Sequence, residues 1–163
     1  MSRSAALPDA LAAWRDEQSV RDLVQTTAAR LDAEDFAGWL ALFDETAIYE
    51  ISSYSPEIRR TMTWWTSDRP ALEKILREIP QHEREPARRL RLLGPVSVLL
   101  DGDRAQAEVA FAVYRTLPDG ETRLYVVGRY ASSLIRKSET WLYIEHRVLL
   151  ETRLLESFTH LPL

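Results

Sequence analysis

The C-terminal half of the chain consists of long apolar runs separated by short turn sequences. The runs cover residues 90–100, 105–116, 122–135 and 141–155, and the turns between them lie at 101–103, 118–121 and 137–139. Two of these turns contain Asp-Gly, which favours a hairpin because glycine takes a positive φ without a Cβ clash. Strands of ten or more residues twist and curve the sheet that they form. The segment therefore predicts a four-stranded antiparallel meander around which the rest of the chain folds.

The first half of the chain predicts helices that can cover this sheet. Residues 18–33 carry one apolar helical face, formed by Val20, Leu23, Val24, Thr27, Ala28 and Leu31. A second, short helix carries Phe36, Trp39, Leu40 and Phe43. A third helix begins after Ser67 or Asp68, has Pro70 in its first turn and ends at Pro80.

Strand-like segments separate the second and third helices. A turn at residues 44–46 is expected to lead into a first strand at 47–52, and residues 59–66 predict a second strand. Residues 81–89 read as a charged linker before the meander. The order of elements predicts an α+β fold with a cone-like, curved, mainly antiparallel sheet, covered by three helices from the N-terminal half. We expect residues 1–163 to form a single domain, with residues 1–15 as a loose N-terminal arm.

Composition excludes several classes of function. The chain has 163 residues, 45% of them apolar and 28% charged, which is typical of a globular protein. Its net charge of −4 provides no basic field for nucleic acid or a membrane surface. The chain has no cysteine, so it cannot ligate an iron–sulfur cluster, form a disulfide or use a thiol nucleophile. No signal peptide or membrane span is recognisable, and we expect a cytoplasmic protein.

Three histidines are the natural candidates for acid–base or metal chemistry. His82 lies in the charged linker and His160 near the C-terminal end, and no pair has the spacing of a metal site. His146 shares one face of the last strand with Leu142, Ile144, Val148 and Leu150 and is expected to point into the cone. Such a residue is either a core histidine with satisfied ring nitrogens or the base of a pocket. Asp44 and Tyr49, where the helices meet the first strand, are the groups that could assist it, although Asp44 also suits a turn.

Basic and aromatic residues predict surfaces for a protein partner. Trp141, Tyr143 and Arg147 lie on the opposite face of the last strand from His146, so we expect them on the outside of the sheet. The run Arg88, Arg89 and Arg91 forms a second candidate patch, since arginine, tryptophan and tyrosine are enriched in protein–protein interfaces. These six residues are the predicted interface residues.

Several stretches resemble the small (β) subunit of aromatic-ring-hydroxylating dioxygenases. They are Phe36-x-x-Trp39-Leu40-x-Leu42-Phe43 followed by Tyr49, Arg88-Arg89-Leu90-Arg91, Val127-Gly128-Arg129-Tyr130, then Leu134, Arg136 and Trp141, and Arg147-Val148-Leu149-Leu150-Glu151. The resemblance covers nearly the whole chain. Two departures are Gly94-Pro95-Val96, where many members have Ser-Asn-Val, and Glu151, where aspartate is usual.

The resemblance implies a nuclear-transport-factor-like (cystatin-like) cone and a structural, non-catalytic role in aromatic compound catabolism. In that family the partner large subunit carries a Rieske [2Fe–2S] cluster and a mononuclear iron. Three large and three small subunits assemble, and a self-trimer of the small subunit is expected. The family assigns no catalytic residue or cofactor to this chain. Two alternatives stay open: a stand-alone isomerase, cyclase or dehydratase that uses His146, Asp44 and Tyr49 in the cone pocket, and a ligand-binding or scaffold module.

Overall fold

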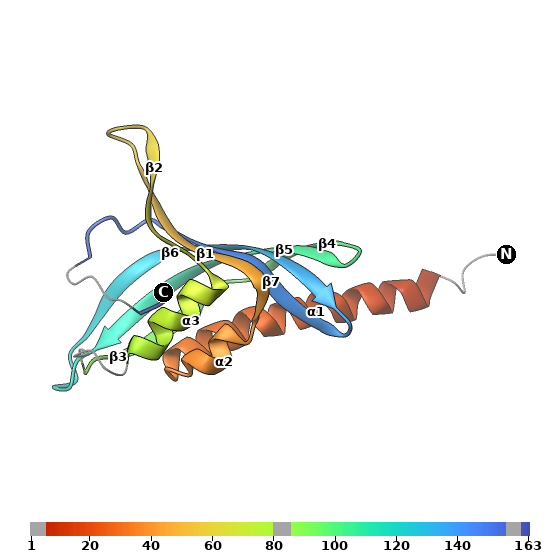
Figure 1. Ribbon diagram of the computed structural model, residues 1–163, viewed down its shortest axis with the longest axis horizontal. Coiled ribbons are helices and arrows are strands. Elements are labelled where there is room, and N and C mark those ends of the chain that lie inside the picture. The colour runs from red at the N-terminus through yellow and green to blue at the C-terminus, as the bar shows by residue number, and fades with distance from the viewer. Residues whose placement is uncertain (1–5, 80–85, 156–160) are drawn as a thin grey trace.

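The computed structural model describes residues 6–79, 86–155 and 161–163, with side chains from residue 9 onward. Its elements are α1 (Ala6–Asp32), α2 (Phe36–Leu40), β1 (Phe43–Ser55), β2 (Arg60–Asp68), α3 (Arg69–Glu78), β3 (Arg88–Leu93), β4 (Ser97–Asp101), β5 (Arg104–Thr116), β6 (Thr122–Lys137) and β7 (Thr140–Leu150). All three helices lie on the same side of one curved sheet (Figure 1). The predicted α+β cone is confirmed.

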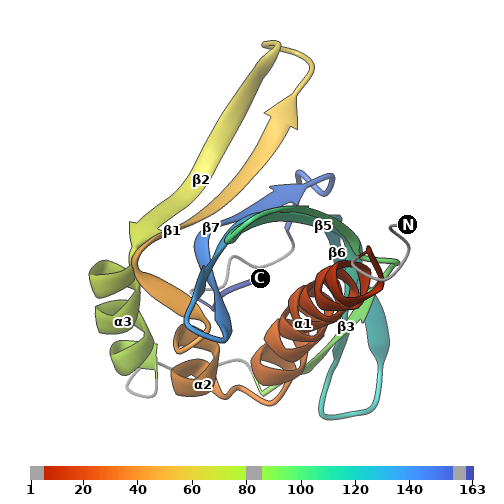
Figure 2. The same cartoon turned by 90° about the vertical axis from the view of Figure 1, so that its right-hand side faces the viewer.

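One seven-stranded sheet connects the two halves of the chain. The strand order is β2-β1-β7-β6-β5-β3, and β4 also pairs with β5. Every pair is antiparallel except β1 with β7, which is parallel. The sheet curls over α1, while the β1–β2 hairpin extends away from it as an arm (Figure 2). An ion pair of 2.6 Å between Glu57 and Arg153 ties the tip of this arm to the segment after β7.

Helix α1 buries the predicted apolar face. Its six predicted members are all buried, from Val20 and Thr27 at 0% and 1% exposure to Leu23 at 9%. The helix begins at Ala6, twelve residues earlier than predicted. Residues 6–15 are therefore helical, which corrects the expected loose arm over residues 1–15. Residues 1–5 lie outside the described residues. This first part extends beyond the sheet (Figure 1), and its Leu11 and Trp14 are exposed. A helix without a buried stripe has no periodic signal, which is why the sequence pattern missed it.

The start of α3 agrees with its sequence. Of the two predicted caps, Asp68 is the one used, because its side chain accepts a 2.9 Å hydrogen bond from the backbone N–H of Ala71. Pro70 lies in the first turn as expected. Pro80 and residues 81–85 of the predicted linker lie outside the described residues, and residues 88–89 belong to β3.

Strand boundaries differ from the predictions in three places. The expected turn at 44–46 is part of β1. Asp44 accepts hydrogen bonds from Thr46 there, and the pairing of β1 with β7 shifts register at this point instead of the chain reversing. The expected strand 90–100 is two strands, β3 and β4, which pair with the two halves of β5. Pro95 has no N–H to donate, and it separates them. The last strand ends at Leu150 rather than at 155.

Gly128 lies where the backbones of strands β6 and β7 approach each other closely. A Cβ at this position would lie 2.4 Å from the carbonyl oxygen of Leu149 and 3.1 Å from Cα of Leu150. Both contacts are with backbone, which cannot rotate away. We expect Gly128→Ala to lower the free energy of unfolding by about 2 kcal/mol, as overpacked substitutions do, measured by urea denaturation. Gly94→Ala is the control, since its nearest contact would be an ordinary 3.5 Å; equal effects of the two substitutions would contradict the prediction.

Candidate functional site

His146 lies inside the cone, as predicted, with 1% of its surface exposed. Its Nδ1 is 2.7 Å from the hydroxyl of Ser132 on the neighbouring strand β6. Four aromatic rings surround the imidazole at centroid distances of 4.7–5.9 Å: Tyr143, Tyr130, Tyr49 and Phe43. The environment is therefore an aromatic core with one local hydroxyl partner.

Burial keeps this histidine neutral. Loss of solvent lowers the pKa of His146 from 6.5 to about 3. The same cause raises the pKa values of Tyr49, Tyr130 and Tyr143. The Nε2 atom of His146 has no hydrogen-bond partner among the described residues. An imidazole with so low a pKa is a weak base near neutral pH.

The end of the described chain packs against the same interior. The N–H of Leu163 donates a 3.0 Å hydrogen bond to the hydroxyl of Tyr49, and Leu163 is 2% exposed. The carbonyl of Pro162 accepts a 3.0 Å hydrogen bond from Arg91. His146 is not among the residues that line the cavities described below. Leu163 thus packs beside Tyr49, and aromatic side chains pack around His146.

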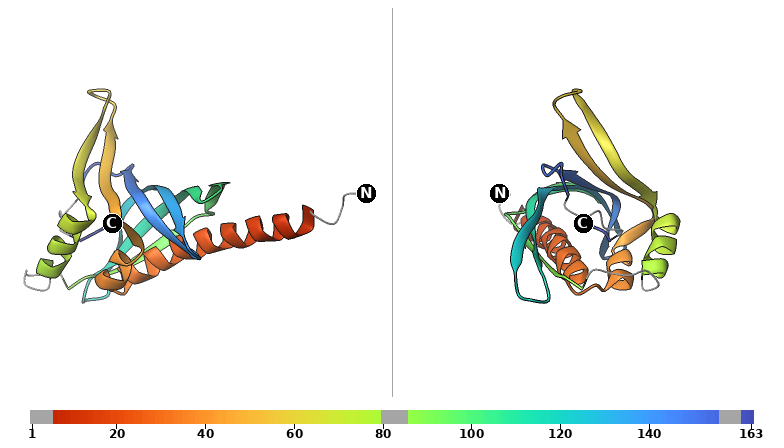
Figure 3. Two further views of the ribbon diagram at one scale, coloured as in Figure 1. Left: turned by 45° about the vertical axis from the view of Figure 1, so that its right-hand side comes forward. Right: turned by 90° about the vertical axis from the view of Figure 1, so that its left-hand side faces the viewer.

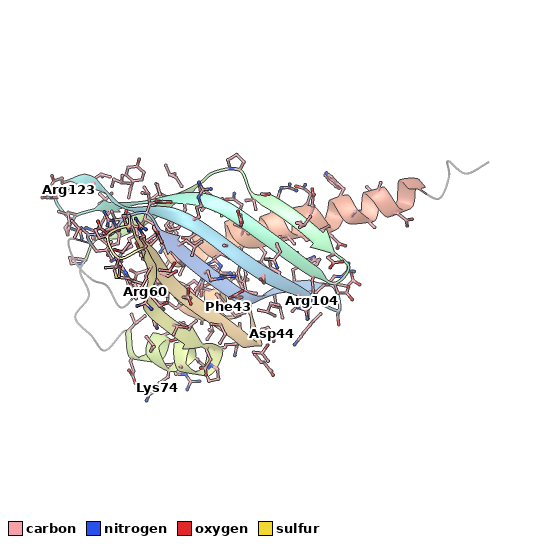
Figure 4. The ribbon with its side chains drawn as sticks, turned by 90° about the horizontal axis from the view of Figure 1, so that it is seen from above. Phe43, Asp44, Arg60, Lys74, Arg104 and Arg123 are labelled. Atoms are coloured by element: carbon pink, nitrogen blue, oxygen red, sulfur yellow. The ribbon has the colours of Figure 1, made fainter. Side chains whose placement is uncertain are left out.

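The three residues of the alternative catalytic reading are not brought together. Tyr49 and His146 are stacked, with centroids 5.9 Å apart. Asp44 instead forms an ion pair with Lys137 at the end of β6 and accepts hydrogen bonds from Thr46. These contacts, with the Lys137 bond as the largest cause, lower the pKa of Asp44 to about 2. Phe43 and Asp44 are adjacent on β1 (Figure 4), but only Phe43 contacts the histidine ring.

The predicted outer face of β7 is wrong for its aromatic members. Trp141 and Tyr143 are 3% and 0% exposed, so they are core residues rather than interface residues. Ile144 pairs with neither neighbouring strand, and this extra residue shifts the alternation of β7. Trp141 and Tyr143 therefore point inward together with His146. Arg147 is exposed as predicted and forms a 3.1 Å ion pair with Glu145.

The three arginines of β3 have three different environments. Arg91 is buried, and its guanidinium and backbone N–H bind the carboxylate of Asp32 at 2.6 and 2.9 Å. This ion pair joins the end of α1 to the sheet, which corrects the expectation that Arg91 forms a partner surface. Arg88 is exposed, and Arg89 lies 5.7 Å above the ring of Tyr125.

Two cavities with arginine in their walls lie where β3, β5 and β6 end. The larger, of about 530 Å³, lies between the end of α1, the start of β3 and residues 161–162, and includes Arg88, Arg89 and Arg91. The smaller, of about 260 Å³, is lined by Arg115, Arg123, Leu124, Tyr125, Thr152 and Leu154. Sequence reasoning missed Arg115 and Arg123. Counting outward from the predicted turn at 118–121 would have placed Arg115 opposite residue 124; the loop in the structure is one residue longer, so Thr116 pairs with Thr122 and Arg115 with Arg123.

The sequence and the fold match known proteins. Residues 12–147 match the model of the SnoaL-like domain. The chain is 30% identical to the methanesulfonate monooxygenase hydroxylase subunit beta of Methylosulfonomonas methylovora, over 89% of this chain and 86% of that one. It is also 30% identical to the 2-aminobenzenesulfonate 2,3-dioxygenase subunit beta of Alcaligenes sp, over 91% and 99%. The chain belongs to the same family as these oxygenase β subunits.

A solved β subunit shares the fold. That chain, from Novosphingobium aromaticivorans, is assigned as the β subunit of an aromatic-ring-hydroxylating dioxygenase, and it superposes with a TM-score of 0.78, at 19% identity over 86% of the present chain and 92% of that one. Within residues 6–79, 86–155 and 161–163 of the present chain, no group of three or more histidine, cysteine or acidic residues is placed to hold a metal ion. No helix among the described residues is long and apolar enough to cross a membrane.

The buried histidine predicts a pH dependence of stability. Because the folded pKa of about 3 lies below the unfolded value of 6.5, the unfolded chain binds the proton better. The stabilisation is therefore complete above pH 6.5, and it is lost by about 1.4 kcal/mol per pH unit as the pH falls below that value. We expect the free energy of unfolding to fall more steeply between pH 6.5 and 4.5 in the wild type than in His146→Gln. Parallel urea-denaturation profiles of the two proteins would contradict this.

The Arg91–Asp32 pair predicts a large effect of one arginine and a small effect of its neighbour. Arg91→Met leaves the largely buried Asp32 without its cation, so we expect a loss of about 3 kcal/mol of unfolding free energy. Arg88→Met, on the same strand but exposed, should change stability by less than about 0.5 kcal/mol. Thermal and urea unfolding of both variants measure the difference. A small effect of Arg91→Met would contradict the structural role.

Proposed function

We propose that this β subunit is a structural, non-catalytic component of a multicomponent oxygenase. It assembles with a large subunit that carries a Rieske [2Fe–2S] cluster and a mononuclear iron. The observation that carries the proposal is the match to oxygenase β subunits over about nine-tenths of the chain. The protein has no cysteine, and a Rieske cluster needs two, so its residues do not fit that group.

The geometry of the cone supports a structural role. His146 is neutral at physiological pH because burial lowers its pKa, and four aromatic rings pack around its imidazole. Asp44 is occupied by Lys137. A stand-alone isomerase, cyclase or dehydratase would need an accessible acid–base pair beside a substrate cavity. The described residues offer His146 and Tyr49 only as parts of a packed aromatic core.

The assembly that we propose has three large and three small subunits, with residues 1–163 as a single domain and a trimer of β subunits in the cytoplasm. Arg147, Arg88 and Arg89 remain predicted interface residues, since the first two are exposed and Arg89 is partly exposed. The substrate is an aromatic compound or a sulfonate. The two relatives are named for methanesulfonate and 2-aminobenzenesulfonate, so a sulfonate group is what their substrates share.

Recovery of the tagged chain from its native host tests the proposal. We expect a larger protein with the visible absorption of a Rieske cluster to co-purify, and oxygenase turnover to require both chains. The isolated β subunit should contain no iron and show no turnover. Absence of an iron–sulfur protein from the recovered material would contradict the proposal. So would an isomerase, cyclase or dehydratase activity of the isolated chain that His146→Ala abolishes while the fold is preserved.

A further inference from the structure

The buried guanidinium of Arg91 has one edge that is only half used. Its Nη1 donates a 2.6 Å hydrogen bond to Asp32, while Nη2 donates a 3.0 Å hydrogen bond to the carbonyl oxygen of Pro162. The Nε atom, which shares one edge of the guanidinium with Nη2, is buried and has no hydrogen-bond partner among the described residues. Native proteins rarely leave a buried donor without an acceptor, because the loss of water is then not compensated. This edge of Arg91 therefore calls for a second acceptor oxygen.

The hydroxyl of Tyr130 is a second buried donor close to this edge. It also forms no hydrogen bond with the described residues. Burial raises the pKa of Tyr130, and the guanidinium of Arg91, which lies close to the hydroxyl, acts in the opposite direction. The ring is held in place by Phe111, which stacks on it at a centroid distance of 4.1 Å. Two donors of the cone interior are thus fixed side by side without sufficient acceptors.

Residues 162 and 163 lie against the same groups. The Pro162 carbonyl accepts its hydrogen bond from Arg91, and the backbone N–H of Leu163 donates a 3.0 Å hydrogen bond to the hydroxyl of Tyr49. Because Pro162 and Leu163 are consecutive, the Arg91 guanidinium and the Tyr49 hydroxyl lie within the span of one residue. Leu163 is 2% exposed and belongs to the apolar core. The segment lies inside the curve of the sheet (Figure 2), where it is bound much as a peptide ligand would be.

This segment is an incomplete match for the donors that surround it. One carbonyl oxygen satisfies Nη2 of Arg91 and leaves Nε and the Tyr130 hydroxyl without an acceptor. A carboxylate has two oxygens and binds the edge of a guanidinium in a bidentate geometry. The cavity of about 530 Å³ is lined by both Arg91 and Pro162, and its volume lies within the usual range of roughly 300–1,000 Å³ for small-molecule sites. A small acid can therefore reach the segment from this cavity.

We propose that Arg91, Tyr130 and Tyr49 form a binding site for a small carboxylic acid with an apolar body, and that residues 162–163 occupy this site when no such acid is bound. The carboxylate bridges Nε and Nη2 of Arg91 and accepts a hydrogen bond from Tyr130. The apolar body takes the place of the Leu163 side chain.

The ion pair of Arg91 with Asp32 is compatible with this site. Asp32 uses Nη1 and the backbone N–H of Arg91, so its hydrogen bonds do not involve the edge that binds the acid. The side chain of Asp32 is 19% exposed, and water therefore screens the repulsion between the two carboxylates. The site adds ligand binding to a chain whose proposed role is structural, and it does not depend on that role.

Titration of the complete chain with benzoate tests the site, and benzamide is the neutral probe of the same shape. We expect calorimetry to give benzoate an affinity at least tenfold higher than that of benzamide. Arg91→Lys keeps a cation beside Asp32 but lacks the bidentate edge, so it should weaken benzoate binding at least tenfold. Tyr130→Phe removes only a hydroxyl and should weaken it severalfold. The matched control is Tyr54→Phe, the same change at an exposed position of the β1–β2 arm, which should leave the affinity unchanged.

Leu163→Ala shows whether the acid replaces the segment or binds elsewhere. The substitution weakens the hold of residues 162–163, so the apparent affinity for benzoate should rise severalfold. In the wild type, saturating benzoate should accelerate hydrogen exchange of the Leu163 amide, because its bond to Tyr49 is broken. An unchanged affinity in Leu163→Ala together with an unchanged exchange rate would overturn the assigned occupant of the site.

Thermal unfolding verifies that each variant is folded, and Tyr130→Phe carries the test if Arg91→Lys does not fold. Three results would overturn the site: no binding of millimolar benzoate to the wild type or to Leu163→Ala, equal binding of benzoate and benzamide, or wild-type affinity in Tyr130→Phe. The first of these is also expected if the unpartnered donors bind only ordered water. None of the measurements involves a large subunit, so failure of the site leaves the proposed function unaffected.

Discussion

The pairing of β6 with β7 around Ile144 determines what the inside of the cone contains. On the C-terminal side of Ile144, His146 and Val148 point inward, and on its N-terminal side Trp141 and Tyr143 point inward too. Without the extra residue, strict alternation would put these two large rings on the outer surface. The bulge thus directs three aromatic or imidazole rings of one strand into the core. The fold depends on this because Tyr143 also bonds Thr27 of α1, at 2.9 Å, and so connects sheet and helix.

Much of the architecture could be predicted because it follows from periodic patterns. The apolar stripe of α1, the Asp-Gly turns and the inward position of His146 each depend on local spacing, and the structure has them. The bulge at Ile144 and the division of the strand at Pro95 could not be read in this way. Both depend on which strand pairs with which, and neighbouring strands impose their register over local alternation.

The candidate site was predictable in its members but not in its geometry. Sequence alone placed His146 inside and grouped both Tyr49 and Asp44 with it, and of these two only Tyr49 contacts the histidine. Asp44 pairs instead with Lys137, the last residue of β6. Strand β7 lies between β1 and β6 in the sheet, so no local pattern in the sequence connects these two residues. Arg91 is similar: its partner Asp32 lies 59 residues away. Side-chain partners of high sequence separation are set by topology, not by local pattern.

A fold that elsewhere can enclose a cavity here encloses side chains of the protein itself. Leu163 bonds Tyr49, aromatic rings surround His146, and burial keeps that histidine neutral. The hairpin between β5 and β6 lies at the end of the sheet that is far from the N-terminus of α1 (Figure 3). Leu90, Leu92 and Leu124 are more than half exposed there, and exposed apolar side chains on adjacent strands are typical of a surface that a partner covers. Such exposure agrees with the proposed role of this β subunit as one part of an assembly.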